Sequence, residues 1–82
     1  MNDILIVDDE KDIRELISEI LIDEGYSTRS SSNSADCLDQ VSNAPPDLLI
    51  LDIWLKDSNM DGIDILKKVK IDYPQVPVVI IS

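Results

Sequence analysis

The chain has 82 residues, 44% of them hydrophobic and 29% charged, which leaves room for one globular domain. Seventeen acidic residues outnumber seven basic ones, histidine is absent, and the formal net charge is −10. This balance argues against direct binding to nucleic acid or to an anionic membrane, because both attract lysine and arginine. A single cysteine excludes an internal disulfide. The sequence contains no membrane-length apolar run and no basic leader before its first strand, so we expect a cytoplasmic chain.

The first predicted elements are a buried strand and an amphipathic helix. Ile4–Val7 is a continuous apolar run, which is typical of a strand covered on both faces in a parallel sheet. A helix is predicted from about Lys11 to Glu24, with Asp9 and Asp12 suited to its N-terminal end and Gly25 to its stop. The apolar residues that share one face of this helix are Ile13, Leu16, Ile17, Ile20 and Leu21.

The next pair of elements is shorter and more polar. Tyr26–Ser30 is predicted as a polar strand at an edge of the sheet. Ser34–Val41 is predicted as a helix, with Asn33 or Ser34 as its N-cap, and Pro45–Pro46 prevents its continuation. The residues at helical spacing in this segment are Ala35, Leu38 and Val41.

Two further apolar runs enclose the third predicted helix. Leu48–Leu51 reads as a second buried strand and ends in Asp52, and Val78–Ile81 reads as another strand near the end of the chain. Between them a helix is predicted from Gly62 to about Tyr73, with Asp61 as its N-cap. The residues predicted to face inward are Ile63, Leu66 and Val69.

Alternating strands and helices predict an α/β fold with a parallel sheet, in which ligands bind beyond the carboxyl ends of the strands. Those ends carry Asp8, Asp9, Asp52 and Ser82. Carboxylates about 4 Å apart repel by roughly 4 kcal/mol at an effective dielectric near 20, so a compensating cation is expected. Oxygen ligands without histidine favour Mg²⁺. A carboxylate beside Mg²⁺ can act as a nucleophile toward a phosphoryl group, and the Ser82 hydroxyl could bond a phosphoryl oxygen.

Four segments resemble, in order and in spacing, the receiver domain of two-component response regulators: Ile4–Glu10, Leu49–Asp52, Met60–Gly62 and Pro77–Ser82. The resemblance covers the whole chain. It implies a flavodoxin-like (CheY-like) doubly wound parallel sheet with strand order 2-1-3-4. Residues 1–82 would then form a partial receiver domain that lacks the last helix, strand and helix of the family.

The resemblance also implies a role for each site residue. Asp52 matches the phosphoacceptor, Asp9 the direct Mg²⁺ ligand and Asp8 its neighbour. The backbone carbonyl of Trp54 matches the third protein ligand of the metal, and Ser82 matches the switch residue that contacts the phosphoryl group. Asp61 and Gly62 match a structural turn. A sensor histidine kinase would donate the phosphoryl group, and an output domain outside this chain, expected to be transcriptional, would respond.

Two features depart from the common pattern. The loop after Asp52 is longer than in most receivers, and Ile53–Leu55 makes it similar to the NtrX-like nitrogen-regulation subfamily. The chain also lacks the lysine that the family carries on its fifth strand; Lys67, Lys68 and Lys70 are assigned to the solvent side of the third helix. The strand at residues 78–81 would be a bare edge, so we expect a homodimer or segment-exchanged oligomer through it.

Two other functions compete with this interpretation. A receiver-like module that accepts no phosphate and works through protein contacts stays open, because the family lysine is missing. A phosphohydrolase of the haloacid-dehalogenase kind is disfavoured, because it needs an acid two residues after the nucleophile, where this chain has Trp54. We therefore expect a signalling domain that assists only its own phosphotransfer and dephosphorylation, rather than an enzyme.

Overall fold

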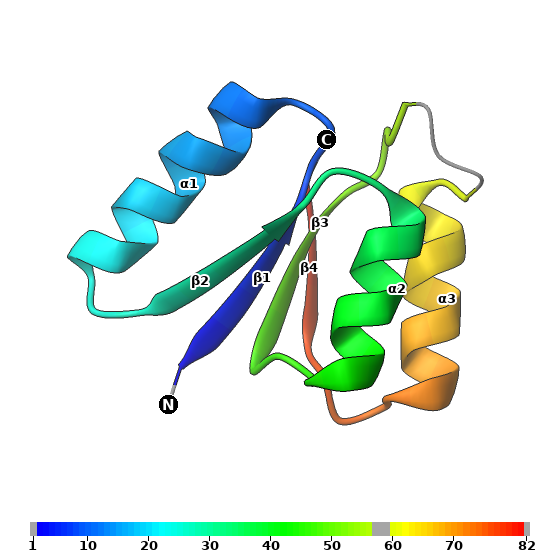
Figure 1. Cartoon of the computed structure of the whole chain (residues 1–82). Helices are drawn as coiled ribbons and strands as arrows, with labels where there is room; N and C mark the ends of the chain where they lie inside the picture. The colour runs from blue at the N-terminus through cyan, green and yellow to red at the C-terminus, as the bar shows by residue number, and fades with distance from the viewer. Residues whose placement is uncertain (1, 57–59, 82) are drawn as a thin grey trace.

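The computed structural model describes residues 2–56 and 60–81, which form one parallel sheet with helices on both faces (Figure 1). The strand order is β2-β1-β3-β4, as predicted. None of the described helices is long and apolar enough to cross a lipid bilayer. The elements in chain order are β1 (Asp3–Val7), α1 (Lys11–Asp23), β2 (Ser27–Ser31), α2 (Ser34–Asn43), β3 (Leu48–Asp52), α3 (Gly62–Asp72) and β4 (Val78–Ile81).

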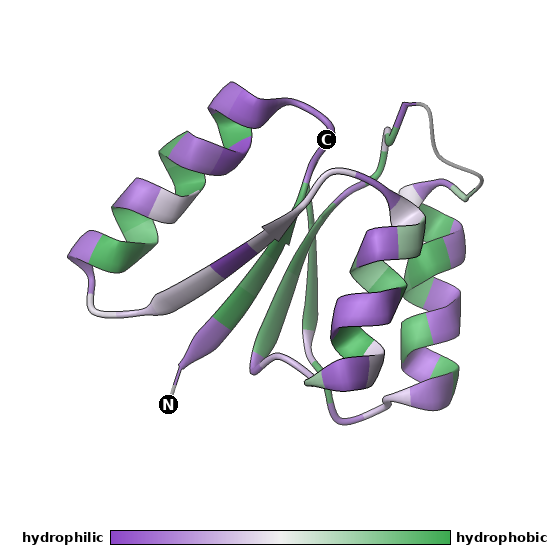
Figure 2. Cartoon of the chain, viewed as in Figure 1, coloured by the Kyte–Doolittle hydropathy of each residue, from purple (hydrophilic) through white to green (hydrophobic). Residues whose placement is uncertain are grey.

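The main core lies between the sheet and the pair of helices α2 and α3. Side chains alternate between the two faces of a strand, so Leu5 and Val7 of β1 point to this core while Ile4 and Ile6 point to the face that carries α1. All four are buried, and Figure 2 shows β1, β3 and β4 as the hydrophobic strands beside a polar β2. The core residues that are fully buried include Leu5, Val7, Cys37, Val41, Leu49, Leu51, Ile65 and Val69.

The helix ends are defined by side chains and by one glycine. The Asn33 side chain accepts the Asp36 N–H at 2.8 Å and caps α2, and Asp61 accepts the Asp64 N–H at 2.9 Å and caps α3. After α1, Gly25 has φ 96°, in the left-handed region that glycine adopts at low cost. The N–H groups of residues 25 and 26 then bond the carbonyls of residues 22 and 21, which closes the helix with a Schellman motif.

The predicted apolar face of α1 is only partly buried. Leu16 and Ile20 are each 55% exposed, whereas Ile13, Ile17 and Leu21 are half-buried. The helix packs against β2 and β1, and it is the only described helix on its face of the sheet (Figure 1). Two of the five residues that share the apolar face of α1 are thus largely exposed, because helical spacing identifies a face but not the width of the surface that covers it.

Smaller corrections apply to α2 and α3. Ile63 was predicted to point inward but is 36% exposed, while Ile65 is fully buried and Leu66 is half-buried. In α2, Ala35 is exposed although it shares helical spacing with Leu38 and Val41, whereas Cys37 is fully buried. Which of the apolar residues of a helix are buried depends on the angle at which that helix meets the sheet.

Candidate functional site

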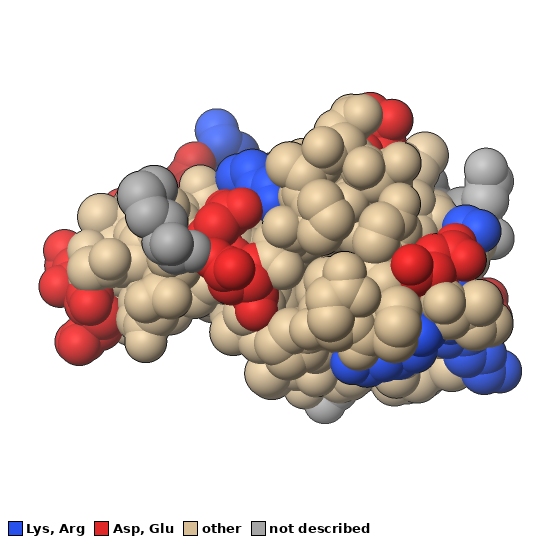
Figure 3. All heavy atoms as spheres, turned by 90° about the horizontal axis from the view of Figure 1, so that it is seen from below, with Lys and Arg blue, Asp and Glu red and all other residues tan. Residues whose placement is uncertain are grey.

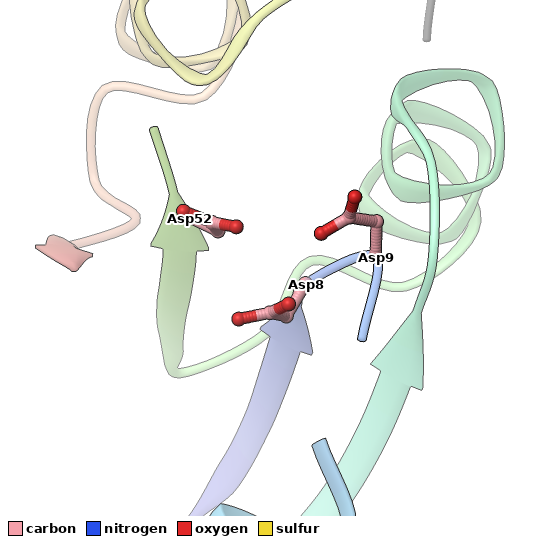
Figure 4. Close-up of side chains that lie close together, drawn as sticks. All are labelled: Asp8, Asp9 and Asp52. Atoms are coloured by element: carbon pink, nitrogen blue, oxygen red, sulfur yellow. The ribbon is translucent and has the colours of Figure 1, made fainter. Parts of the chain in front are cut away.

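Three carboxylates converge at the edge of the sheet where β1 and β3 end. Val7 pairs with Leu51 in the parallel ladder, so Asp8, which follows β1, and Asp52, the last residue of β3, lie at the same level of the sheet edge. One carboxylate oxygen from each of Asp8, Asp9 and Asp52 lies within 4.8 Å of the others. Figure 4 shows the three side chains turned toward one another from the ends of the two strands. The convergence predicted from the sequence is confirmed.

Asp8 is the most buried of the three acids and is held on several sides. It is 5% exposed, and its Oδ1 accepts the Glu10 N–H at 2.8 Å. Its backbone N–H donates to the Ser31 carbonyl at 3.1 Å, and its own carbonyl accepts from the Arg14 guanidinium at 2.7 Å. These bonds fix the turn between β1 and α1, so the Asp8 carboxylate has little freedom to swing into solvent.

The environment of Asp8 disfavours its charged form. Burial raises the pKa of the Asp8 carboxyl above its ordinary value of 3.8, and the hydrogen bond from the Glu10 N–H opposes this rise. The negative charges of Asp52 and Asp9, and then that of Glu10, raise the pKa further. A divalent cation among the carboxylates would relieve both the burial cost and the repulsion.

Asp9 and Asp52 are half-buried and bond to the loop that follows β3. The Trp54 N–H donates to Asp52 Oδ1 at 3.0 Å, and the Lys56 N–H donates to Asp9 Oδ2 at 3.2 Å. The sequence suggested that Asp9 suits the N-terminal end of α1, but Asp9 does not cap this helix. The residue at the N-cap is Glu10, whose side chain makes no capping bond. Two backbone N–H groups of this loop therefore donate to two of the three carboxylates, Asp52 and Asp9.

The acids line an open hollow of about 350 Å³. The Trp54 side chain at its rim is 70% exposed, and Ile81 of β4, which pairs with Asp52, closes the opposite side. Ser82, the predicted switch residue, lies outside the described residues. A second hollow, of about 300 Å³ between α1 and β2, has mixed charge and contains none of the three acids. The residues around the acidic hollow are Asp8, Asp9, Glu10, Ile13, Asp52, Trp54, Lys56 and Ile81.

Asp61 and Gly62, at the start of α3, lie against the peptide that follows Asp52. The Gly62 N–H donates to the Ile53 carbonyl at 3.1 Å. A Cβ atom at Gly62 would lie 2.6 Å from the Ile53 Cα and still closer to the Asp52 carbonyl oxygen. Only glycine lets the start of α3 approach the peptide that follows Asp52 this closely, which is an observed basis for a structural role of the Asp61–Gly62 turn.

The sequence interpretation missed two basic residues at this site. Lys56 lines the acidic hollow, and Arg14 of α1 donates to the Asp8 carbonyl, but neither residue was singled out from the sequence. The position of Lys56, four residues after Asp52, was the available signal. Lys67, Lys68 and Lys70 are exposed on α3, as predicted.

Residues 4–82 match the family model described as "Response regulator receiver domain". The chain is 48% identical over 81 residues to the nitrogen assimilation regulatory protein NtrX of Azorhizobium caulinodans, covering 99% of this chain and 18% of that protein. The crystal structure of the receiver domain of NtrX from Brucella abortus superimposes with a TM-score of 0.92 at 45% identity, covering 95% and 65% of the two chains. The response regulator TrrA of Thermotoga maritima, solved in complex with Mg²⁺ and BeF, gives a TM-score of 0.91 at 31% identity, covering 98% and 68%.

Proposed function

The chain belongs to the response regulator receiver domain family, and from that premise we propose that its residues 1–82 form the phosphoryl-accepting part of an NtrX-like regulator, with Asp52 as the acceptor. The observation that carries this proposal is the meeting of Asp8, Asp9 and Asp52 in one hollow at the carboxyl edge of the sheet. The chain spans about a fifth of the length of the NtrX relative, so the activity of a longer protein is part of the proposal.

The residues of the hollow suit a hard divalent cation. Asp9, Asp52 and the backbone carbonyl of Trp54 would hold Mg²⁺, with Asp8 acting through water, and no histidine or second cysteine in the sequence offers softer ligands. Bound Mg²⁺ supplies neutralisation of negative charge on the transferring phosphoryl oxygens. Support comes from the raised pKa of Asp8, which reflects first the burial of this carboxyl group and then the nearby negative charges of Asp52 and Asp9.

Asp52 performs the chemical step in this proposal. The Trp54 N–H holds Oδ1, so the carboxylate offers Oδ2 to the phosphorus of a phosphohistidine on a sensor histidine kinase. An Asp52 oxygen–phosphorus bond forms while the bond from phosphorus to the imidazole nitrogen breaks, and the electron pair returns to that nitrogen. Water later attacks the aspartyl-phosphate, which releases inorganic phosphate and restores Asp52. In this proposal the chain assists only its own phosphotransfer and dephosphorylation.

Other residues and partners complete the proposal. Ser82 would turn its hydroxyl toward a phosphoryl oxygen, and the changed surface would act on a transcriptional output domain, with the whole protein in the cytoplasm. Direct nucleic-acid contact by this segment is not part of the proposal. On the end of the molecule where the strands begin, basic atoms form small patches next to acidic ones rather than a continuous positive surface (Figure 3).

Association through β4 follows from its exposed edge. β4 pairs with β3 on one side only, and Val79 is 47% exposed. An edge of this kind favours pairing with a second copy or exchange of a segment. Light scattering across a concentration series is expected to show dimers or larger species at high concentration, and a mass that stays at one chain throughout would contradict this part of the proposal.

The acceptor role is tested by incubating the chain with acetyl phosphate and Mg²⁺ and recording the intact mass. Wild type is expected to gain the mass of one phosphoryl group, and Asp52→Asn to gain none. Asp39→Asn, which removes an exposed carboxylate on α2, is the matched control and should behave as wild type. Equal uptake by wild type and Asp52→Asn, or no uptake by either folded protein, would overturn the proposed function.

A further inference from the structure

Lys56 is the only lysine or arginine that lines the acidic hollow within residues 2–56 and 60–81. Its backbone N–H donates to Asp9 Oδ2 at 3.2 Å, which anchors its main chain at the rim. Its side chain is exposed, and its ammonium forms no ion pair with any carboxylate in the described part of the chain. The backbone of Lys56 is thus held beside the three acids, while its exposed ammonium group is free to reorient.

The other six basic residues have different places in the fold. Two of them, Lys11 and Arg14, line the second hollow, and Arg14 bonds a backbone carbonyl rather than a carboxylate. Arg29 pairs with Asp3 at 2.7 Å, at the opposite end of the sheet. The remaining three, Lys67, Lys68 and Lys70, lie on α3, where Lys68 pairs with Asp72 and Lys70 donates to the Val76 carbonyl. None of the six lines the acidic hollow.

The charge of the hollow changes on phosphorylation. Three carboxylates and one Mg²⁺ leave one negative charge, and Glu10 at the rim adds another. A phosphoryl group on Asp52 makes the hollow more negative, because it brings roughly −1.5 to −2 charges near neutral pH and replaces the single charge of the Asp52 carboxylate. An ammonium group can donate up to three hydrogen bonds to such oxygens, and charge-assisted bonds of this kind are the strong ones.

We propose that Lys56, on the loop after Asp52, is a phosphoryl-contacting residue of this chain, whose ammonium binds the oxygens of the group carried by Asp52. This inference rests on the proposed function and deepens it. Before transfer, the same positive charge weakens Mg²⁺ binding, since two cations share one hollow. After transfer, it stabilises the aspartyl-phosphate. Lys56 therefore has opposite effects on the metal and on the phosphoryl group.

Lys56 is expected to weaken Mg²⁺ binding and to strengthen binding of the phosphoryl group, and a merely structural residue would not have both effects. Lys56→Gln is compared with Lys56→Arg and with Lys67→Gln, which removes an exposed lysine of α3 away from the hollow. Mg²⁺ affinity is measured by calorimetry. Lys56→Gln is expected to bind Mg²⁺ about two- to fourfold more tightly than wild type, while Lys56→Arg and Lys67→Gln stay within about 1.5-fold of it.

Phosphoryl uptake from acetyl phosphate at saturating Mg²⁺ is the second readout. Lys56→Gln is expected to form aspartyl-phosphate about tenfold more slowly, with Lys56→Arg restoring most of the rate. If wild type takes up the group and Lys56→Gln matches it in both rate and Mg²⁺ affinity, the inference about Lys56 is overturned and the acceptor role of Asp52 stands. If folded wild type takes up no group, the proposed function fails, and the inference fails with it.

Discussion

Replacing Asp8 with asparagine should stabilise the metal-free chain and weaken its stabilisation by Mg²⁺. Asp8 is 5% exposed and shares its hollow with two other carboxylates. An asparagine has nearly the same shape, and its Oδ1 still accepts the Glu10 N–H that Asp8 accepts at 2.8 Å. The substitution therefore removes a negative charge from a buried place while keeping the local hydrogen bond, and it takes away one acid from the metal site.

The size of the effect can be estimated from the distances. Within 4.8 Å, one pair of full charges repels by about 3.5 kcal/mol at an effective dielectric near 20. Asp9 and Asp52 are half-exposed, and solvent screens them, so a net gain of about 2 kcal/mol is expected. For a domain of this size, that corresponds to a rise in Tm of roughly 8–16 °C. In wild type, free Mg²⁺ at 100 times its Kd adds about 2.7 kcal/mol.

Thermal unfolding followed by circular dichroism, with EDTA or with Mg²⁺, checks both halves of this prediction. With EDTA, Asp8→Asn should melt above wild type; Mg²⁺ should raise the Tm of wild type much more than that of Asp8→Asn. Asp39→Asn, exposed on α2, should stay within about 0.5 kcal/mol of wild type in both conditions. An Asp8→Asn variant that melts below wild type with EDTA would refute the claim that the three carboxylates repel one another.

The remaining predictions concern single features of the fold. The pKa of Asp8 is raised in the folded state, so the folded chain holds the Asp8 proton more tightly than the unfolded chain does. The stability that this proton adds is present in full below about pH 4 and is lost as pH rises through the raised pKa. Without metal, the advantage of Asp8→Asn in urea unfolding should therefore grow from about pH 4 to pH 7. Gly62→Ala should lower the unfolding free energy by about 1–3 kcal/mol, since the added methyl group meets the Asp52 peptide; an unchanged urea midpoint would contradict the close approach. Asn33→Ala should cost about 1 kcal/mol through loss of the α2 cap, whereas Asn33→Asp should cost much less. Burial raises the pKa of the Cys37 thiol to about 12, so a thiol reagent at pH 8 should label it only after urea is added, and rapid labelling of the folded chain would contradict its burial.

The sequence predicts the strands and the meeting of the acids because both follow from local pattern and one rule of topology. Continuous apolar runs predict the strands β1, β3 and β4, although only β1 is buried on both faces and Val79 of β4 is 47% exposed. Strand-terminal acids in a parallel sheet must share an edge. In the strand order β2-β1-β3-β4, β1 and β3 are neighbours, so Asp8 and Asp52 at their carboxyl ends lie close together.

The sequence does not predict what depends on helix rotation or loop path. Leu16 and Ile63 fit helical spacing as well as Ile17 and Ile65 do, and only the packing angle of each helix decides which are buried. Lys56 reaches the hollow because the loop after β3 turns back to donate its N–H to Asp9, a contact between residues 47 positions apart. Periodicity carries no information about such a contact.

The central claim, that Asp52 carries the phosphoryl group, is tested most directly by mapping the modified residue. The chain is treated with acetyl phosphate and Mg²⁺, reduced with borohydride to convert the aspartyl-phosphate to homoserine, digested and sequenced by mass spectrometry. Homoserine is expected at position 52, with Asp8 and Asp9 unchanged. Homoserine at position 8 or 9, with Asp52 intact, would contradict it.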